Sequence, residues 1–276
     1  IRKFLFYSGN ERSRFFGIED WHKRGNETRV HHHMLAADLG ERDGIGFGHK
    51  LNCTGYFSKK KYNDLMELAS QLSKVIPSAR IHARLIDRIA YANDASYFRL
   101  VPQAVVQPNS ISEIQFLFKF TQQNKIPMTF RAAGTSLSGQ AVTDGILVDI
   151  SKYWDKYSIE DDPRHIRFQP GLVGGFLNNA LKPHRRRIGP DPASIDACMM
   201  GGILANNSSG MCCGVTENSY RTIHSMTFVL PNGFVLDTAD PKANQIFENE
   251  QPHIAKGLLE LKQRIVNSTS QYKGET

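Results

Sequence analysis

A strand–helix–strand pattern that begins at residue 104 constrains the fold more than any other feature of the sequence. Residues 104–107 (Ala-Val-Val-Gln) form a short apolar run closed by Pro108, which is typical of a buried strand. Ser110 then offers a helix N-cap, and Glu113 three residues later completes a capping box. The run at 128–131 is expected to be the next strand. The pattern predicts a βαβ unit with parallel strands.

Further elements lie on both sides of this unit. Leu65, Leu68 and Leu72 have helical spacing, and the Asn232-Gly233 pair between two apolar runs is a strong hairpin signal. The expected elements are a helix over 62–72, strands over 145–150 and 166–169, a helix over 172–181, a hairpin over 226–237 and a helix over 253–267. This order predicts an α+β fold in which strands and helices form two consecutive subdomains.

The sequence divides into three regions. Residues 1–58 lack helical or strand periodicity, so we expect an irregular basic extension there. Residues 59–100 are expected to form a helical lead-in, and residues 101–276 to hold the main domain. Two interpretations of residues 1–58 stay open: a native extension, or the product of a start site assigned too early.

The net charge of the chain is +7 at neutral pH, and most of it lies in the N-terminal part. Residues 1–61 hold 12 Lys and Arg against 7 Asp and Glu, whereas the rest of the chain holds 22 against 20. The main domain is therefore nearly neutral, which argues against a surface that follows a nucleic-acid backbone. We expect no nucleic-acid partner, and binding through the basic N-terminal segment is kept as an alternative function.

Composition excludes several other classes of protein. Hydrophobic residues make up 40% and charged residues 22% of the chain, which is typical of a globular domain. No run of 18 apolar residues is present, so we expect no membrane span. The four cysteines lack metal-ligand spacing and His31-His32-His33 is expected to be a solvated loop, so we predict no metal site. The expected location is cytoplasmic, with reduced thiols.

The first of two small-residue loops follows the strand at 128–131. It reads Arg131-Ala132-Ala133-Gly134-Thr135-Ser136-Leu137-Ser138-Gly139-Gln140. Small residues let a backbone approach a ligand closely, and successive N–H groups in a tight turn bind anions such as diphosphate. Gly134 and Gly139 have the spacing of a phosphate-binding P-loop, but Gln140 and Ala141 replace its lysine and hydroxyl residue. This argues against phosphoryl transfer, and an ordinary turn stays the alternative.

The second small-residue segment runs in two stretches, Gly189-Pro190-Asp191-Pro192-Ala193-Ser194 and Met200-Gly201-Gly202-Ile203-Leu204-Ala205-Asn206-Asn207-Ser208-Ser209-Gly210. Its Asn and Ser side chains could bind a phosphate, a ribose or a ring edge. The Gly-Gly pair would leave room for a flat ring system. An irregular connection is the alternative for this segment alone, but a dinucleotide stretched between the two loops would use both.

These motifs resemble the FAD-linked oxidases of the vanillyl-alcohol-oxidase/PCMH superfamily. Residues 131–140 are similar to its pyrophosphate loop, residues 189–210 to its second flavin-contacting segment, and Leu230-Pro231-Asn232-Gly233 to its usual hairpin. The nearest branch is that of the dehydrogenases acting on D-lactate, glycolate and D-2-hydroxyglutarate. Residues 208–214 and 218–220 resemble its long members, which carry an iron–sulfur region. The resemblance covers roughly residues 60–270 and implies a PCMH-type FAD-binding domain.

The resemblance also implies which residues bind FAD. The backbone amides of Ala133 to Ser138 would donate to the pyrophosphate, and the first loop lacks the histidine that tethers FAD in some members, so the resemblance implies noncovalent FAD. The expected cofactor-binding residues are Arg131, Ala133, Gly134, Thr135, Ser136, Leu137, Ser138, Gly139, Gln140, Pro190, Asp191, Gly201, Gly202, Asn206, Asn207, Ser209 and Gly210. Cys212 and Cys213 are expected to be packing residues.

The implied function is that of the FAD-binding part of an oxidoreductase that oxidises a D-2-hydroxy acid by hydride transfer to flavin N5. The substrate-binding segment of the family is not found before Thr276, so we expect an N-terminal fragment, inactive alone, and assign no catalytic residue. The electron acceptor is open, an iron–sulfur region of the full-length protein being one candidate. The alternatives are a non-catalytic flavin- or nucleotide-binding module and a reductase of the UDP-N-acetylmuramate dehydrogenase type.

Overall fold

The computed structural model describes residues 59–272 except residue 163. Within this range the chain from Asp64 onward forms one compact unit. The predictions for residues 1–58, including those for His31-His32-His33 and Cys53, lie outside the described residues. The domain boundaries at residues 58 and 100 stay predictions.

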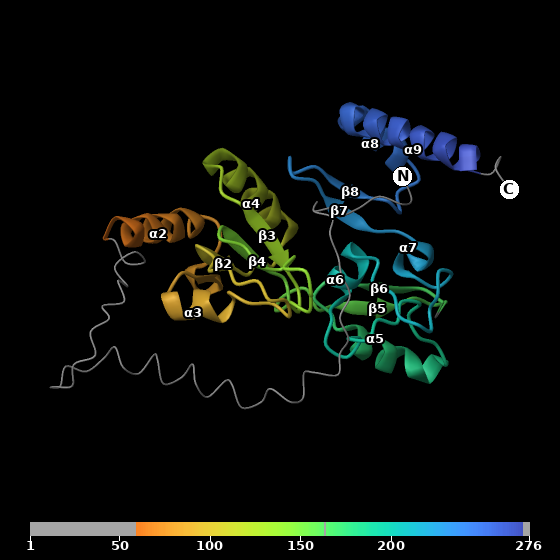
Figure 1. Ribbon diagram of the computed structural model, residues 1–276, viewed down its shortest axis with the longest axis horizontal. Coiled ribbons are helices and arrows are strands. Elements are labelled where there is room, and N and C mark those ends of the chain that lie inside the picture. The colour runs from red at the N-terminus through yellow and green to blue at the C-terminus, as the bar shows by residue number, and fades with distance from the viewer. Residues whose placement is uncertain (1–58, 163, 273–276) are drawn as a thin grey trace. The chain divides into compact units, whose positions relative to one another are not determined.

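A four-stranded sheet forms the first part of the unit, in the order β1-β2-β4-β3 (Figure 1). The strands are β1 (Ile81–His82), β2 (Ala104–Val106), β3 (Met128–Arg131) and β4 (Ile146–Asp149). β4 pairs in parallel with β2 and with β3, and β1 is antiparallel to β2. The predicted βαβ unit is thereby confirmed, because α4 (Ile111–Asn124) connects the parallel strands β2 and β3.

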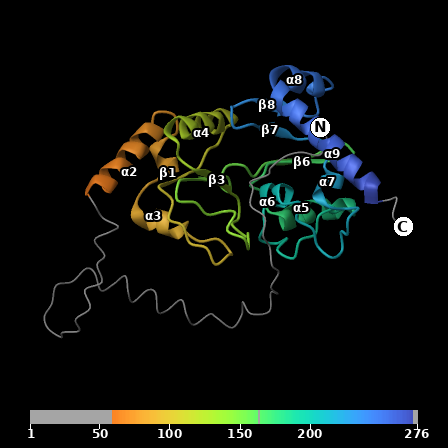
Figure 2. The same ribbon diagram turned by 45° about the horizontal axis from the view of Figure 1, so that its top comes forward.

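Helices cover both faces of this sheet. Helix α2 (Lys59–Leu72) and helix α4 lie on one side of it, and α3 (Leu85–Ala90) lies on the other (Figures 1 and 2). Leu72 of α2 and Leu117 of α4 join Ile146 of β4 in one fully buried core. All three residues of β2 are buried, as expected of a strand covered on both faces. The sheet therefore presents β3 and β4 as rigid supports for the loop between them.

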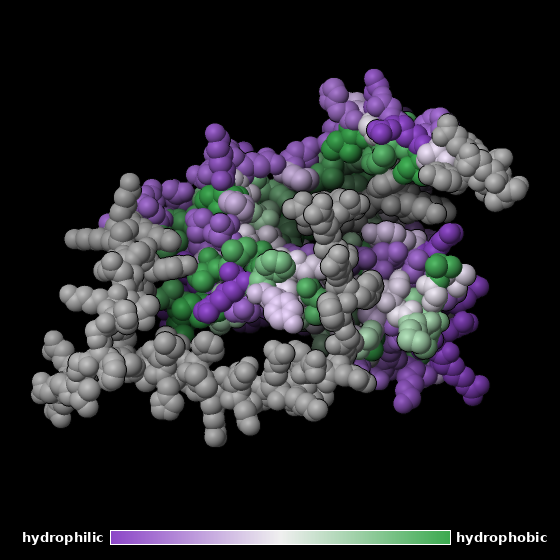
Figure 3. All heavy atoms as spheres, viewed as in Figure 1, coloured by the Kyte–Doolittle hydropathy of each residue, from purple (hydrophilic) through white to green (hydrophobic). Residues whose placement is uncertain are grey.

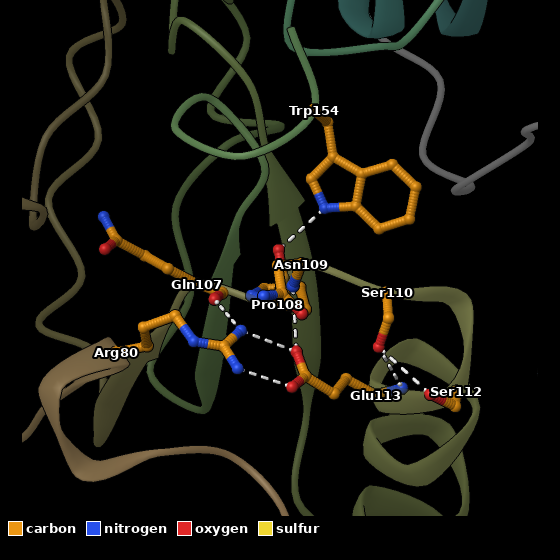
Figure 4. Close-up of polar contacts among 8 residues, drawn as sticks. All are labelled: Arg80, Gln107, Pro108, Asn109, Ser110, Ser112, Glu113 and Trp154. Carbon is orange, nitrogen blue, oxygen red and sulfur yellow. Dashed lines mark hydrogen bonds and ion pairs between the residues drawn. The ribbon is translucent and has the colours of Figure 1, made fainter. Parts of the chain in front are cut away.

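The predicted cap of α4 is confirmed, and it contains a buried ion pair. Ser110 Oγ accepts the backbone N–H of Glu113 at 3.4 Å. The Glu113 carboxylate does not close the capping box on Ser110; it accepts the N–H of Asn109 at 2.8 Å and two hydrogen bonds from Arg80, at 2.6 and 2.7 Å (Figure 4). Arg80 also donates to the carbonyl of Gln107. Both charged side chains are only 10% exposed, so this pair fixes the turn between β2 and α4.

The Glu113 carboxylate should make the fold sensitive to acid. Burial acts to raise its pKa, but the hydrogen bonds from Arg80 and Asn109 outweigh burial, and its pKa lies below the ordinary value. The stabilisation is therefore complete above the unfolded-state pKa of about 4.3, and it is lost as the pH falls through the lower folded-state pKa. Urea unfolding at pH 7, 5, 4 and 3 should show that wild type loses more stability below pH 4 than Glu113→Gln does. Equal losses in the two proteins would contradict this assignment.

A second core lies around two short strands and two helices. Strand β5 (Tyr157–Ile159) pairs antiparallel with β6 (Ile166–Phe168), and α5 (Gly174–Leu181) and α6 (Met200–Ala205) pack beside them. The short helices η3 (Ser78–Arg80), η4 (Lys182–His184) and α7 (Ser219–Thr222) complete the connections. The predicted strand and helix of this region are confirmed. Strand β5 was not predicted, because two of its three residues are exposed and carry no alternating apolar pattern.

The C-terminal part forms a third hydrophobic core. Two consecutive subdomains were predicted from the sequence, and this core was not separated from them. The predicted hairpin is confirmed as β7 (Thr227–Val229) and β8 (Val235–Asp237), with Gly233 at φ +86° in its turn. It packs against α8 (Ala243–Glu250) and α9 (Pro252–Tyr272). The single helix predicted over 253–267 is longer, and a separate helix precedes it. The Gln115 amide of α4 donates to the Gly233 carbonyl at 2.7 Å, which joins the hairpin to this helix.

Helix α9 exposes several hydrophobic side chains. Leu259 is 60% and Val266 is 53% exposed on α9, and Figure 3 shows hydrophobic surface on the α8–α9 pair. None of the helices in the described part of the chain combines the length and hydropathy that a membrane span requires.

Candidate functional site

The loop between β3 and β4 has the backbone expected of an anion-binding turn. Gly134 and Gly139 both lie at φ +71°, a region that favours glycine. Within the described residues, no protein group accepts a hydrogen bond from the amide N–H groups of residues 133–137. The amide of Ser138, in contrast, donates to Ser136 Oγ at 3.2 Å. Five of the six predicted amide donors therefore lack a described partner, and the sixth is already used inside the loop.

The Arg131 side chain lies beneath this loop. Its Nη1 donates to the carbonyls of Tyr91, at 3.1 Å, and Asn93, at 2.8 Å. Its Nη2 would stand only 2.6 Å from a Cβ added at Gly134, so the guanidinium lies directly against the loop backbone. Nε and Nη2 have no described hydrogen-bond partner. The prediction that Arg131 contacts FAD stays a prediction, but Nη1 already holds residues 91 and 93 through its two hydrogen bonds.

Residues 91–98 were not identified from the sequence as part of the site, although this segment contacts the β3–β4 loop. The Asp94 carboxylate accepts the N–H of Ser96 at 2.8 Å and that of Ala141 at 3.3 Å, and Ala95 donates its N–H to the Gly134 carbonyl at 3.0 Å. The Phe98 ring lies against Gly139, where an added Cβ would be 2.6 Å from the ring. The Asp-Ala-Ser sequence at 94–96 is an Asx-turn signal that could have marked this segment.

A buried polar network anchors the same segment to the sheet. The Asp149 carboxylate at the end of β4 is 2% exposed, and it accepts hydrogen bonds from Tyr91 OH at 2.9 Å and Gln107 Nε2 at 2.8 Å. Its other oxygen accepts the N–H and hydroxyl of Ser151. Burial, together with the negative charge of Asp149, raises the pKa of Tyr91 to about 12. Tyr91 is therefore a neutral donor at physiological pH and a fixed point for the loop above it.

The second predicted segment contains a helix where a loop was expected. Gly201 and Gly202 lie inside α6, so the loop prediction for them is corrected. A Cβ at Gly201 would stand 2.9 Å from that of Pro170, so close packing alone accounts for this glycine. A Cβ at Gly202 would meet nothing within 4 Å. Open space beside the backbone therefore exists at Gly202 and not at Gly201, and the contact of either glycine with a flat ring stays a prediction.

The two stretches of the second segment touch each other through their backbones. A Cβ at Gly210 would overlap the carbonyl oxygen of Asp191, so only glycine fits there. Pro190 is buried and Asp191 is half-buried. Ser209 donates its hydroxyl to the carbonyl of Asn207, whose side chain accepts the N–H of Tyr220 at 3.1 Å. The contact of Gly210 with Asp191 brings the two stretches of the second segment together.

The first and second predicted loops also meet. Asn206 Nδ2 donates to Gln140 Oε1 at 3.1 Å, and Ser136 Oγ lies 3.3 Å from the same oxygen. Residues far apart in the sequence, from the β3–β4 loop and the end of α6, therefore line one region. A dinucleotide stretched between the two loops is consistent with this placement.

The cysteines differ from one another in burial. Cys213 is buried and its Sγ contacts the Gly210 backbone, as expected of a packing residue, whereas Cys212 is exposed, so the packing prediction for Cys212 is wrong. Burial raises the pKa of the Cys198 thiol. The basic residues at 184–187, which precede the second segment, are exposed. The described residues hold no cluster of His, Cys, Asp or Glu suited to a metal ion.

The residues of the β3–β4 loop fit a diphosphate-bearing cofactor. Five successive amide N–H groups are available to it, two glycines provide the turns, and the open side of Gly202 lies on the second segment, which the Asn206–Gln140 contact joins to this loop. The Arg131 guanidinium adds positive charge beneath these amides. Such an arrangement binds anions through backbone dipoles and charge.

Relatives with known names match this chain over part of its length. The D-2-hydroxyglutarate dehydrogenase of Haemophilus influenzae is 29% identical over 59% of this chain and 16% of its own length. The glycolate oxidase subunit GlcD of Escherichia coli K12 is 29% identical over 59% of this chain and 34% of its own length. The chain therefore spans about a sixth and about a third of these two relatives.

A solved structure and a family model agree with these relatives. The structure of p-cresol methylhydroxylase superposes with a TM-score of 0.52 at 14% identity, over 68% of this chain and 38% of that one, which shows a shared fold. The FAD binding domain family matches residues 102–239, half of the chain, and this range contains both small-residue loops. The resemblance to the vanillyl-alcohol-oxidase/PCMH superfamily is thus confirmed, with FAD as the cofactor, and the chain belongs to the FAD binding domain family.

Proposed function

We propose that this chain is the FAD-binding part of a flavin-dependent dehydrogenase that oxidises a D-2-hydroxy acid of the lactate, glycolate or 2-hydroxyglutarate class. The observation that carries the proposal is that relatives named for two different 2-hydroxy acids match the same share of the chain, 59%. The shared substrate feature is a hydroxyl group beside a carboxylate. The proposal therefore names this class and not one acid.

Bound FAD would supply the acceptor for a hydride from the substrate carbon. The residues of this chain would bind and orient it: the amides of residues 133–137 would donate to the diphosphate, and the open side of Gly202 would lie beside the ring system. The hydrogen bond between Asn206 and Gln140 would hold the two loops in a fixed position relative to each other. Holding the cofactor in one orientation is what hydride transfer demands, because the reacting atoms must approach closely. No described residue is assigned as acid or base.

Three finer statements belong to the same proposal. FAD would be bound noncovalently, because residues 131–140 include no histidine. The electron acceptor stays open, an iron–sulfur region of a longer protein being one candidate; the D-2-hydroxyglutarate dehydrogenase is about twice as long as GlcD, because 170 aligned residues are 16% of the former and 34% of the latter. A cytoplasmic location is supported by the free thiols at residues 198, 212 and 213.

The test uses the protein encoded by the complete natural reading frame. Heat treatment should release a flavin that chromatographs as FAD, and the holoprotein should reduce an artificial dye with D-2-hydroxyglutarate, D-lactate or glycolate. The L-isomers of the first two acids should give little reduction. If their carboxylate and hydroxyl are bound in the same places, the hydrogen on the hydroxyl-bearing carbon points away from the flavin.

Other results would favour the alternatives. An FAD-loaded protein that oxidises none of the three acids would favour the non-catalytic flavin-binding module. NADPH-dependent reduction of an enolpyruvyl UDP-sugar would favour the UDP-N-acetylmuramate dehydrogenase type. Flavin that stays with the denatured protein would contradict noncovalent binding.

A further inference from the structure

The β3–β4 loop is held in place from outside by a group of residues that do not belong to it. We call this group the brace, and its members are Tyr91, Asn93, Asp94, Ala95 and Phe98. The brace touches residues 131–141 at four places, which are Arg131, Gly134, Gly139 and Ala141. Four contacts spread over eleven residues leave the loop backbone little freedom.

The loop has few bonds of its own to hold its shape. Within residues 131–140 the described internal hydrogen bonds all involve Ser136 Oγ, which bonds to the amides of Ser138 and Gln140 and to the Gln140 side chain. The amides of residues 133–137 hold no described protein partner that would fix their direction. A short chain with five unpaired N–H groups would adopt many conformations without external contacts, and ordering it on binding would weaken affinity.

Asp94 carries the key contact of the brace. One carboxylate oxygen accepts the Ser96 N–H and fixes the turn of the brace itself, and the other accepts the Ala141 N–H at the end of the loop. A carboxylate close to an anion-binding loop would ordinarily repel the anion. Here both oxygens are directed at N–H groups outside residues 133–137. Both carboxylate oxygens of Asp94 therefore hold backbone N–H groups, one in the brace and one at residue 141.

We propose that Asp94 and Phe98 are positioning residues, which hold the amide N–H groups of residues 133–137 in the orientation that binds the cofactor diphosphate. The proposal rests on the proposed role of this loop as the diphosphate site. It assigns the two residues no contact with the cofactor. They act through the loop backbone, Asp94 at Ala141 and Phe98 at Gly139.

The first experiment removes one acceptor from Asp94. Asp94→Asn should raise the Kd of the full chain for FAD and for ADP about ten-fold or more, because a hydrogen bond to a charged group is lost. Its Kd for riboflavin, which has no phosphate, should not change. The matched control is Asp144→Asn, which removes the same charge from an exposed side chain with no described hydrogen bond. Calorimetry with the three ligands measures all of these values.

The second experiment covers the case in which Asp94→Asn fails to fold. Phe98→Ala should also weaken FAD and ADP and spare riboflavin, because the ring that supports Gly139 is removed. Tyr97→Ala is its control, since the Tyr97 side chain is 98% exposed and has no described contact. Phe98→Leu should restore most of the affinity by refilling the space beside Gly139.

The outcomes separate the proposal from the function on which it rests. If wild type binds neither FAD nor ADP, the role of the loop fails and the positioning proposal fails with it. If wild type binds both and Asp94→Asn and Phe98→Ala bind equally well, the positioning proposal alone is overturned. Equal weakening of ADP and riboflavin would also overturn it, since that pattern indicates a general structural defect.

Discussion

Arg80→Met should lower the free energy of unfolding by about 3–5 kcal/mol, the cost of leaving a buried charge without its partner. The Arg80 guanidinium makes two hydrogen bonds to Glu113 and a third to the Gln107 carbonyl, and both charged side chains are 10% exposed. Methionine fills much of the volume of arginine. The lost stability therefore measures the effect of the unpaired Glu113 charge and not that of a cavity. Urea unfolding at pH 7 measures the difference.

The exposed Arg84–Asp87 pair offers a matched control. Arg84 also makes two hydrogen bonds to a carboxylate, at 2.7 and 2.9 Å, but its side chain is 79% exposed. Arg84→Met should leave the unfolding midpoint nearly unchanged, because exposed ion pairs contribute little to stability. Similar losses in the two variants would show that burial is not the source of the effect.

The pH dependence of Arg80→Met supplies a second check on the same cause. Without Arg80, burial raises the pKa of Glu113 above its unfolded value, so the folded protein prefers the protonated carboxyl. The variant should therefore gain stability as the pH falls from 7 towards 5, whereas wild type should not. A variant that loses stability in parallel with wild type over this range would contradict a buried unpaired carboxylate.

The elements governed by local chemistry were predictable from the sequence. The Ser110 cap, the turn at Asn232-Gly233 and the buried strand β2 each follow from residues adjacent in the chain. The β3–β4 loop could also be predicted, since a run of small residues after a strand is a local signal. The bond from Glu113 to Asn109 is local, but nothing local indicated that Glu113 would also bond to Arg80, which lies 33 residues away.

The parts that could not be predicted depend on backbone contacts between distant segments. Part of the brace meets the loop through backbone carbonyl and amide groups of Asn93, Ala95 and Gly134, which depend little on residue type. Only the contact from the Asp94 carboxylate had a local signal, the Asx-turn sequence at 94–96. Gly201 presented a similar difficulty: a glycine pair predicts a loop by propensity, but both glycines lie in α6, where close packing against Pro170 leaves no room for a side chain at 201. Sequence patterns therefore located the candidate site, and tertiary packing determined how it is held.

Gly139→Val is expected to abolish tight FAD binding by this chain. A non-glycine residue in the left-handed region costs about 1–2 kcal/mol, and a β-branched one more, which alone predicts roughly ten-fold weaker binding if the loop must keep its shape. A Cβ at Gly139 would also stand 2.6 Å from the Phe98 ring and displace it from the loop. Titration of the apoprotein with FAD, followed by flavin fluorescence, measures the loss. Gly257→Ala is the control: its Cβ meets nothing within 4 Å on α9, so binding should not change.

Two causes of this effect can be separated by the double variant Gly139→Val/Phe98→Ala. A valine that blocks the space of the diphosphate would act equally with and without Phe98. The direction of the Cβ, towards the Phe98 ring, indicates that the valine acts by pushing the ring and the loop apart. Removing the ring should then make the valine less harmful, so the two substitutions together should weaken FAD binding less than the sum of their separate effects. Strict additivity would instead mean that the valine acts on the cofactor directly.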